Sequence, residues 1–227
     1  MPELWSPSVG LPNYASEKHS FTECFSMLRY PLKKDSLAFF KNFREKEKLK
    51  IGLVRHFKVK NAIPEKTWMT PAELSKWFED YDLSDIEKGE TDLQNLEWET
   101  CYSSDLSRAE KTAHAIFVGK IIKTEKLREV KAYPIIQANI KLPYQLWAVL
   151  VRLAWLFNHP SQKDSVKAVK ERINLFLDEV FSAGNEHVLI VSHGALMIFM
   201  RKELLKRGFK GPKISHPKNG ILYVFEK

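Results

Sequence analysis

The sequence predicts an α/β protein with a mostly parallel central sheet and helices on both faces. Short apolar segments that suit strands alternate with longer segments of helical periodicity. One apolar segment, "HVLIVSH" at 187–193, is hydrophobic without alternation, as in strands buried on both faces of a parallel sheet. With 227 residues, 44% of them hydrophobic, the chain can form one substantial core.

Two regions are expected along the chain. Residues 1–48 mix Pro, Ser and Gly with scattered aromatic residues, which predicts an extension that is partly disordered or carries a peripheral helix. In that helix Leu37, Phe40 and Phe43 recur at helical spacing. Residues 49–227 are expected to form the α/β domain.

The first elements of the domain have clear boundaries. "IGLVR" at 51–55 is a short apolar strand. A helix is predicted over 71–82, because Thr70 can cap it and Pro71 suits the first helical position. "LEWETCYS" at 96–103 is predicted to be the second strand.

The middle of the domain continues the alternation. A helix is predicted over 104–117, with Leu106, Ala109, Ala113, Ile116 and Phe117 on its inner face. Residues 121–130 read as a strand, and 143–157 as a helix rich in aromatic residues. Residues 165–181 place Val166, Val169, Ile173, Phe176, Leu177 and Val180 in helical register.

The last elements follow the strand at 187–193. Gly194 turns the chain into a helix over 195–207, which Gly208 ends as a C-terminal cap. Residues 220–227 close the chain as a final strand.

Composition limits the classes of partner. The net charge is 36 − 28 = +8. The sequence has no dense basic run with interleaved aromatic residues that would indicate nucleic-acid binding. The excess positive charge is therefore expected to form a solvated face that favours anionic ligands. No apolar run approaches the roughly 18 residues of a membrane span, and the N-terminus lacks a secretory pattern. Cys24 and Cys101 lack metal-ligand spacing; they could form one bridge, but reduced cysteines in a cytoplasmic protein are favoured.

Polar residues follow three of the predicted strands. Arg55 and His56 end the first, Arg108 lies in the first helical turn after the second, and His193 ends the strand before 195–207. Since ligands bind at the carboxyl edge of parallel sheets, these groups are expected to converge there rather than merely reach solvent. A cation in a first helical turn opposes the helix dipole, so Arg108 either binds an anion or extends to solvent.

These motifs resemble the histidine phosphatase superfamily, which includes the cofactor-dependent phosphoglycerate mutases. The resemblance rests on "LVRH" at 53–56, "SSDLSRAEKTA" at 103–113, "LRE" at 127–129 and "VSHG" at 191–194, in the family's order. It covers residues 51–227 and implies a three-layer, phosphoglycerate mutase-like fold.

The resemblance also implies a role for each matched residue. His56 would be the nucleophile that forms a phosphohistidine, and Glu129 would protonate the leaving alcohol. Arg55, Arg108 and His193 would hold the phosphoryl oxygens. The chemistry agrees, because a neutral imidazole is nucleophilic and guanidiniums supply the positive charge that phosphoryl transfer needs. No metal or other cofactor is expected.

Other residues of the candidate site are less specific. Glu125 is a weaker alternative to Glu129 as the proton donor. Ser104, Gly194, Phe57 and Lys58 are further candidates for substrate binding. The family usually has glycine where Phe57 stands, so its ring is expected to border the pocket. Lys58 or Lys60 would meet a second anionic group or remain solvated.

The resemblance predicts a metal-independent phosphomonoester hydrolase of the histidine acid type. The expected substrate is a small phosphorylated metabolite: a sugar, nucleotide or cofactor-precursor phosphate. "REVKAYP" lacks the pattern that follows the acid in mutases, which favours hydrolysis. A phosphomutase, and a catalytically silent member that binds phosphorylated ligands or proteins, remain the alternatives. Trp147, Val151 and Trp155 form either core packing or, with Arg152, a lid. The sequence does not predict the oligomeric state.

Overall fold

The computed structural model describes residues 49–60, 62–136 and 138–227. All of them belong to the compact unit Glu47–Lys227. The extension 1–48 and the helix expected around Phe40 lie outside the described residues.

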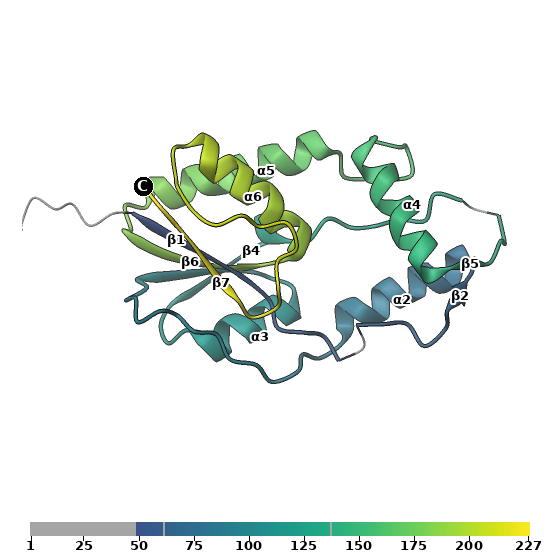
Figure 1. The fold of residues 1–227 in the computed structure, drawn as a ribbon, viewed down its shortest axis with the longest axis horizontal. Coiled ribbons are helices and arrows are strands. Elements are labelled where there is room, and N and C mark those ends of the chain that lie inside the picture. The colour runs from purple at the N-terminus through teal and green to yellow at the C-terminus, as the bar shows by residue number, and fades with distance from the viewer. Residues whose placement is uncertain (1–48, 61, 137) are drawn as a thin grey trace, which may run out of the picture. The chain divides into compact units, whose positions relative to one another are not determined.

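A five-stranded sheet forms the centre of this unit, in the order β4-β3-β6-β1-β7 (Figure 1). Four strands run parallel, and the last is antiparallel to its neighbour β1. The strands are β1 (Lys50–Arg55), β3 (Thr100–Ser104), β4 (Ile121–Thr124), β6 (His187–Ser192) and β7 (Leu222–Glu226). The predicted mostly parallel sheet is therefore confirmed, with an antiparallel edge strand.

Helices cover both faces of this sheet, as the sequence predicts. Helices α5 (Val166–Ser182) and α6 (Gly194–Lys206) lie on one face, and α3 (Ser107–Ile116) lies on the other (Figure 1). Successive side chains of β1 point to opposite faces of the sheet, so this strand contributes to the cores on both sides. Leu53 packs into the core under α5 and α6, whereas Val54 packs into the core under α3.

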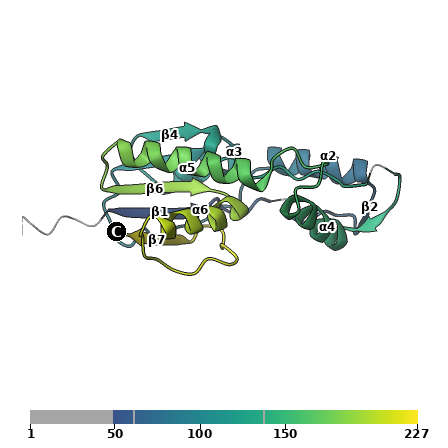
Figure 2. The same cartoon turned by 90° about the horizontal axis from the view of Figure 1, so that it is seen from above.

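A smaller unit of two helices and two short strands lies beyond the carboxyl ends of the parallel strands (Figure 2). It contains β2 (Trp68–Met69), α2 (Pro71–Leu83), β5 (Leu142–Pro143) and α4 (Tyr144–Leu156). Trp147 is its central side chain: it is fully buried, and its indole Nε1 donates to the Met69 carbonyl at 2.8 Å. The two-residue strand pair has no sequence pattern that could have predicted it.

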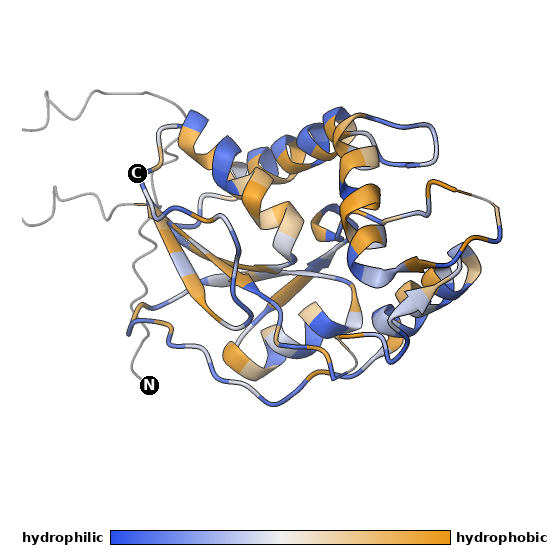
Figure 3. Ribbon diagram, turned by 45° about the vertical axis from the view of Figure 1, so that its right-hand side comes forward, coloured by the Kyte–Doolittle hydropathy of each residue, from blue (hydrophilic) through white to orange (hydrophobic). Residues whose placement is uncertain are grey.

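Helix α4 is hydrophobic over most of its length (Figure 3). Trp147, Val151 and Trp155 are all buried, which confirms the core-packing interpretation of this stripe. Arg152 donates instead to the Ala148 carbonyl within its own helix, at 2.9 Å. Within the described residues, no helix is long and apolar enough to cross a membrane.

Three predicted strands are several residues shorter than the sequence suggested, among them the final strand, which spans Leu222–Glu226 instead of 220–227. Strand β3 begins at Thr100, because the segment before it turns at Leu93, whose carbonyl accepts from the Leu96 amide at 3.2 Å. Strand β4 ends at Thr124, whose hydroxyl accepts from the Lys126 amide and starts the 3₁₀ turn η2 (Glu125–Leu127). The prediction of one strand over 121–130 was therefore wrong beyond its first four residues.

Candidate active site

The ends of β1, β3 and β6 bring the predicted residues together. Arg55 pairs with Ser192 in register, and the His56 amide donates to the Ser192 carbonyl at 3.0 Å. The rings of His56 and His193 consequently lie with centroids 5.1 Å apart, tilted by 57°. Parallel pairing of neighbouring strands thus accounts for the meeting of two histidines that are far apart in the sequence.

His56 is buried, with 2% of its surface exposed. Its Nδ1 lies 2.6 Å from the Phe57 carbonyl, an acceptor that fixes the ring proton on Nδ1 and leaves the Nε2 lone pair available. Burial lowers the pKa of His56 to about 3, and the charges of Arg108 and Arg55 act in the same direction. The imidazole is therefore neutral at neutral pH, the form that can act as a nucleophile.

His193 is fully buried beside it, and its Nε2 lies 2.9 Å from the Ser104 hydroxyl. The Ser104 oxygen already accepts from the Leu106 amide at 3.3 Å, which favours donation of its own hydrogen to Nε2. This pairing favours the His193 tautomer with the proton on Nδ1, a buried atom without a partner among the described residues. Burial lowers the pKa of His193 well below its usual value, with Arg108 adding to the effect.

Two guanidinium groups adjoin the histidines. Arg55 donates from Nη1 to the Pro217 carbonyl at 2.9 Å. Arg108 is 3% exposed, pairs with Asp82 at 2.7 Å and lies 5.2 Å from the ring centre of Tyr81. The Nε atoms of both arginines are buried and have no acceptor within the described residues. Because buried donors are rarely left unpaired, these groups suit an anion that accepts several hydrogen bonds.

Glu129 lies at the N-terminus of α6. Its carboxylate accepts from the amides of Ala195 at 3.2 Å and Leu196 at 3.3 Å, and from that of Val130 at 3.1 Å. Burial raises the pKa of Glu129 above its usual value, although these amides and the charge of Arg108 oppose the rise. A carboxyl group with a raised pKa can carry a proton close to neutral pH. The alternative donor, Glu125, is exposed and pairs instead with Arg128 at 3.2 Å.

Gly194 leaves room for one of the guanidiniums. A side-chain Cβ at this position would lie 3.4 Å from Nε of Arg55, which is tighter than most Cβ contacts. Glycine at the start of α6 thus allows the guanidinium to approach the helix N-terminus.

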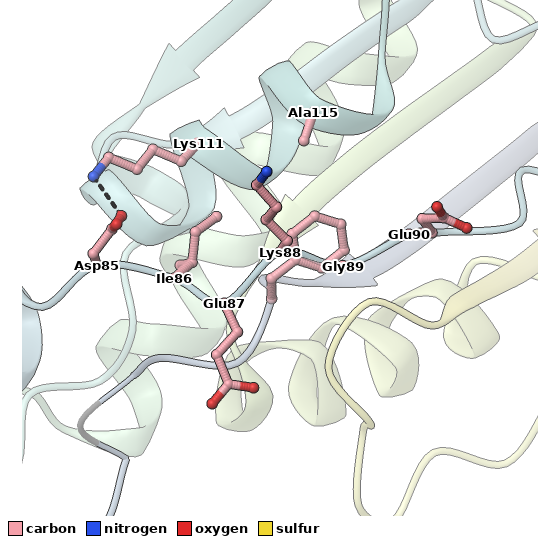
Figure 4. Close-up of a pocket in the computed structure, with 9 residues that line it drawn as sticks. Asp85, Ile86, Glu87, Lys88, Gly89, Glu90, Lys111 and Ala115 are labelled. Carbon is pink, nitrogen blue, oxygen red and sulfur yellow. Dashed lines mark hydrogen bonds and ion pairs between the residues drawn. The ribbon is translucent and has the colours of Figure 1, made fainter.

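The structure places Phe57 and Lys58 outside this cluster. The Phe57 ring packs on Gly89 and Gly220, where an added Cβ would approach it to 2.8 and 3.0 Å. The ring lines an open hollow of about 710 Å³ with residues 85–90 and helix α3 (Figure 4). None of the clustered catalytic candidates lines that hollow. Lys58 is exposed and pairs with Glu87 at 2.9 Å.

Three residues around the cluster were not found from the sequence. Asn219, in the loop before β7, donates from Nδ2 to the His56 carbonyl at 2.7 Å. The Thr112 hydroxyl accepts from the Phe57 amide at 2.9 Å. Asp82 holds Arg108, as described above. Only the approach of distant segments reveals these contacts: Asp82 and Asn219 lie outside the four motifs, and Thr112 lies within "SSDLSRAEKTA" without a role assigned to it.

Comparison with known protein families finds one match. A family model described as the histidine phosphatase superfamily (branch 1) matches residues 83–226. The match includes Arg108, Glu129 and His193, whereas Arg55 and His56 precede it. A search of curated proteins finds no match to this chain.

Solved structures similar to this chain include two phosphatases and a mutase. The alpha-ribazole phosphatase from Shigella flexneri is 17% identical with a TM-score of 0.44, covering 68% of this chain and 79% of its own. A mycobacterial glucosyl-3-phosphoglycerate phosphatase is 18% identical with a TM-score of 0.46, covering 70% and 80%. A phosphoglycerate mutase from Bacillus anthracis is 20% identical with a TM-score of 0.46, covering 71% and 82%.

Proposed function

The chain belongs to the histidine phosphatase superfamily, and we propose that it hydrolyses phosphomonoesters through a covalent phosphohistidine on His56. The observation that carries this proposal is the state of His56. It is buried and neutral, its Nδ1 is tied to the Phe57 carbonyl, and its Nε2 lone pair remains available. A histidine fixed in this way can attack phosphorus without a separate base.

In the first step, the His56 Nε2 lone pair attacks the phosphorus atom and the bond from phosphorus to the leaving oxygen breaks. Glu129 gives its proton to that oxygen, so the product leaves as a neutral alcohol. Arg55, Arg108 and the Nδ1–H of His193 donate to the phosphoryl oxygens. Their donors are fixed before the reaction, which stabilises charge in the transition state without reorganisation.

In the second step, water attacks the phosphohistidine while the Glu129 carboxylate accepts its proton. The bond from phosphorus to Nε2 breaks, inorganic phosphate leaves, and both His56 and protonated Glu129 are restored. Because fixed guanidiniums and histidine donors surround the phosphoryl group, we expect turnover in the presence of EDTA.

The proposed substrate is a small phosphorylated metabolite with an alcohol leaving group. Hydrolysis is proposed rather than phosphoryl transfer, because the segment after Glu129 lacks the pattern that follows the acid in mutases. A mutase would instead move phosphate between positions of one molecule and release little of it.

Hydrolysis of p-nitrophenyl phosphate in EDTA tests this proposal. We expect His56→Asn to abolish turnover and to remove an acid-labile, alkali-stable label that the wild type acquires from a ³²P-labelled substrate. The matched control is His114→Asn, because this histidine is exposed in α3 and takes no part in the proposed mechanism. A panel of sugar, nucleotide and cofactor-precursor phosphates then identifies the preferred leaving group.

Two outcomes would contradict the proposal. Full activity in His56→Asn would rule out the nucleophile. An inactive wild type that still binds inorganic phosphate would identify a catalytically silent member of the superfamily.

A further inference from the structure

A partly buried arginine lies behind the segment that carries Glu129. Arg172 extends from α5, and its Nη2 donates to the Arg128 carbonyl at 2.8 Å. That carbonyl belongs to the peptide group that joins Arg128 to Glu129. The Nε of Arg172 is buried without an acceptor among the described residues, a property it shares with Arg55 and Arg108.

The positive charge of Arg172 interacts with two residues of the candidate site, Glu129 and His193. Burial lowers the pKa of Arg172, and the carboxylates of Asp164 and Glu129 oppose this lowering. The same guanidinium contributes to the lowered pKa of His193. Arg172 is therefore in electrostatic reach of both the proposed acid and the phosphate-binding histidine, although no motif of the family includes it.

The segment around Glu129 is fixed from several directions. The Ser192 hydroxyl of β6 donates to the Leu127 carbonyl at 3.0 Å, and the Arg128 guanidinium donates from Nε to Asp105 at 2.8 Å. The first amides of α6 hold the Glu129 carboxylate. Arg172 supplies the contact from α5, the remaining helix that packs on this segment.

We propose that Arg172 is a positioning residue for Glu129: it fixes the peptide group before the acid, and its positive charge favours the ionised carboxylate. This inference rests on the proposed function, in which Glu129 must both release and regain a proton. The other groups that act on the Glu129 carboxylate are the Arg108 guanidinium from α3, and the amides of Val130, Ala195 and Leu196. Arg108 opposes the effect of burial on the Glu129 pKa, and the attraction between Arg172 and the Glu129 carboxylate acts in the same direction.

Arg172→Met tests both parts of the inference. Loss of the charge raises the pKa of Glu129, so the alkaline limb of the kcat profile moves to higher pH. Loss of the hydrogen bond lowers kcat about tenfold, a fraction of what general acid–base catalysis contributes, with KM almost unchanged. Arg172→Lys keeps the charge and is expected to restore the position of the alkaline limb.

Lys167→Met is the matched control, because it removes an exposed cation from the same helix. It is expected to leave both kcat and the pH profile unchanged. The inference would be overturned if Arg172→Met kept the wild-type alkaline limb of the kcat profile. It would also be overturned if Arg172→Lys failed to reverse the shift.

A second readout separates this inference from the proposed function. The carboxyl carbon of Glu129, labelled with ¹³C and assigned by its loss in Glu129→Gln, reports the pKa without turnover. We expect Arg172→Met to raise this pKa, and Lys167→Met to leave it unchanged. If this shift appears in a protein without phosphatase activity, the proposed function fails while the electrostatic coupling stands. If phosphatase activity is present and the shift is absent, the inference about Arg172 fails.

Discussion

The hydroxyl of Ser104 is a small group with a specific effect on the candidate site. It was expected from the resemblance to contact substrate, yet it lies 2.9 Å from Nε2 of His193 and accepts from the Leu106 amide. In the mechanism we propose, it acts on the phosphoryl group through the tautomer of His193. With the proton on Nδ1, the buried ring offers a donor to an anion instead of a lone pair.

We expect Ser104→Ala to lower kcat/KM by about 10- to 100-fold, because the wrong tautomer of His193 presents a lone pair to the phosphoryl oxygens. The measurement is steady-state hydrolysis of an aryl phosphate. Ser103→Ala is the control, because the Ser103 hydroxyl is equally buried but donates to the Ser104 carbonyl at 2.9 Å. Equal losses in the two variants would indicate a packing effect and would contradict the tautomer argument.

Three catalytic candidates were predictable because each ends a strand whose hydrophobic pattern is clear, whereas Glu129 was predicted only from the family resemblance. Arg55, His56 and His193 end such strands, and pairing of β1 with β6 brings them together. Asn219 could not be predicted in this way. Its hydrogen bond to His56 spans 163 residues and comes from a loop rich in Pro, Lys and Gly, where polar side chains are usually solvated.

Asn219 fixes the backbone carbonyl of His56, so Asn219→Ala is expected to lower kcat roughly tenfold through misplacement of the nucleophile. KM should change little, because Asn219 donates to the protein and not to the phosphoryl group. Thr91→Ala is the matched control: it removes a 2.8 Å bond to Gly220 in the same loop without touching His56. If Thr91→Ala lowers kcat equally, general loosening of the loop explains both results.

At the scale of elements, α2 links the smaller helical unit to Arg108, for which we propose phosphate binding. Its last turns contribute Asp82 and Tyr81, which contact the Arg108 guanidinium. Its first turn is closed by a capping box, in which Thr70 accepts from the Glu73 amide and Glu73 accepts from the Thr70 amide. The cap and the contact with Arg108 thus lie at opposite ends of one helix.

This separation predicts a change of stability without a comparable change of activity. Thr70→Ala should lower the free energy of unfolding by about 1 kcal/mol, as is typical for loss of an N-cap. Urea denaturation measures the loss, and Thr70→Ser should recover most of it because a hydroxyl is retained. kcat/KM is expected to stay within about twofold, since Asp82 and Arg108 keep their contact. A large loss of kcat/KM in Thr70→Ala would show that the whole helix moves.

The elements that the sequence predicted correctly are those with a long, periodic hydrophobic pattern. Helix α5 is an example, because Val169, Ile173 and Leu177 are buried at the predicted spacing. The pair β2 and β5 spans two residues per strand, too short for a pattern of period two. Strand β4 was predicted too long because its continuation, "EKLREV", keeps an apolar residue at Leu127 after the backbone has turned.

For the whole molecule, the two buried histidines of the candidate site lower the folding stability in acid. His56 and His193 are buried at the carboxyl edge of the sheet between two arginines, so the folded protein disfavours their protonated forms. The unfolded chain binds a proton on each histidine near pH 6.5. Between that value and the lowered folded pKa, the unfolded state binds more protons, and folding stability rises with pH.

From pH 7 to pH 5, His56 is expected to lower the free energy of unfolding by about 2 kcal/mol, and His193 acts in the same direction. Other titrating groups also contribute to the pH dependence of the free energy of unfolding in the wild type. Glu129 acts in the opposite sense, because its raised pKa favours the folded state as pH falls.

A difference between variants isolates one histidine: urea denaturation of His56→Asn should show about 2 kcal/mol less loss of unfolding free energy between pH 7 and pH 5 than the wild type. His114→Asn, which removes an exposed ring, provides the reference for general effects of losing an imidazole. If wild type and His56→Asn lose stability in parallel, His56 is not held neutral in the folded protein. In that case the nucleophile would be protonated in mild acid, and activity should fall below pH 6 in step with its titration.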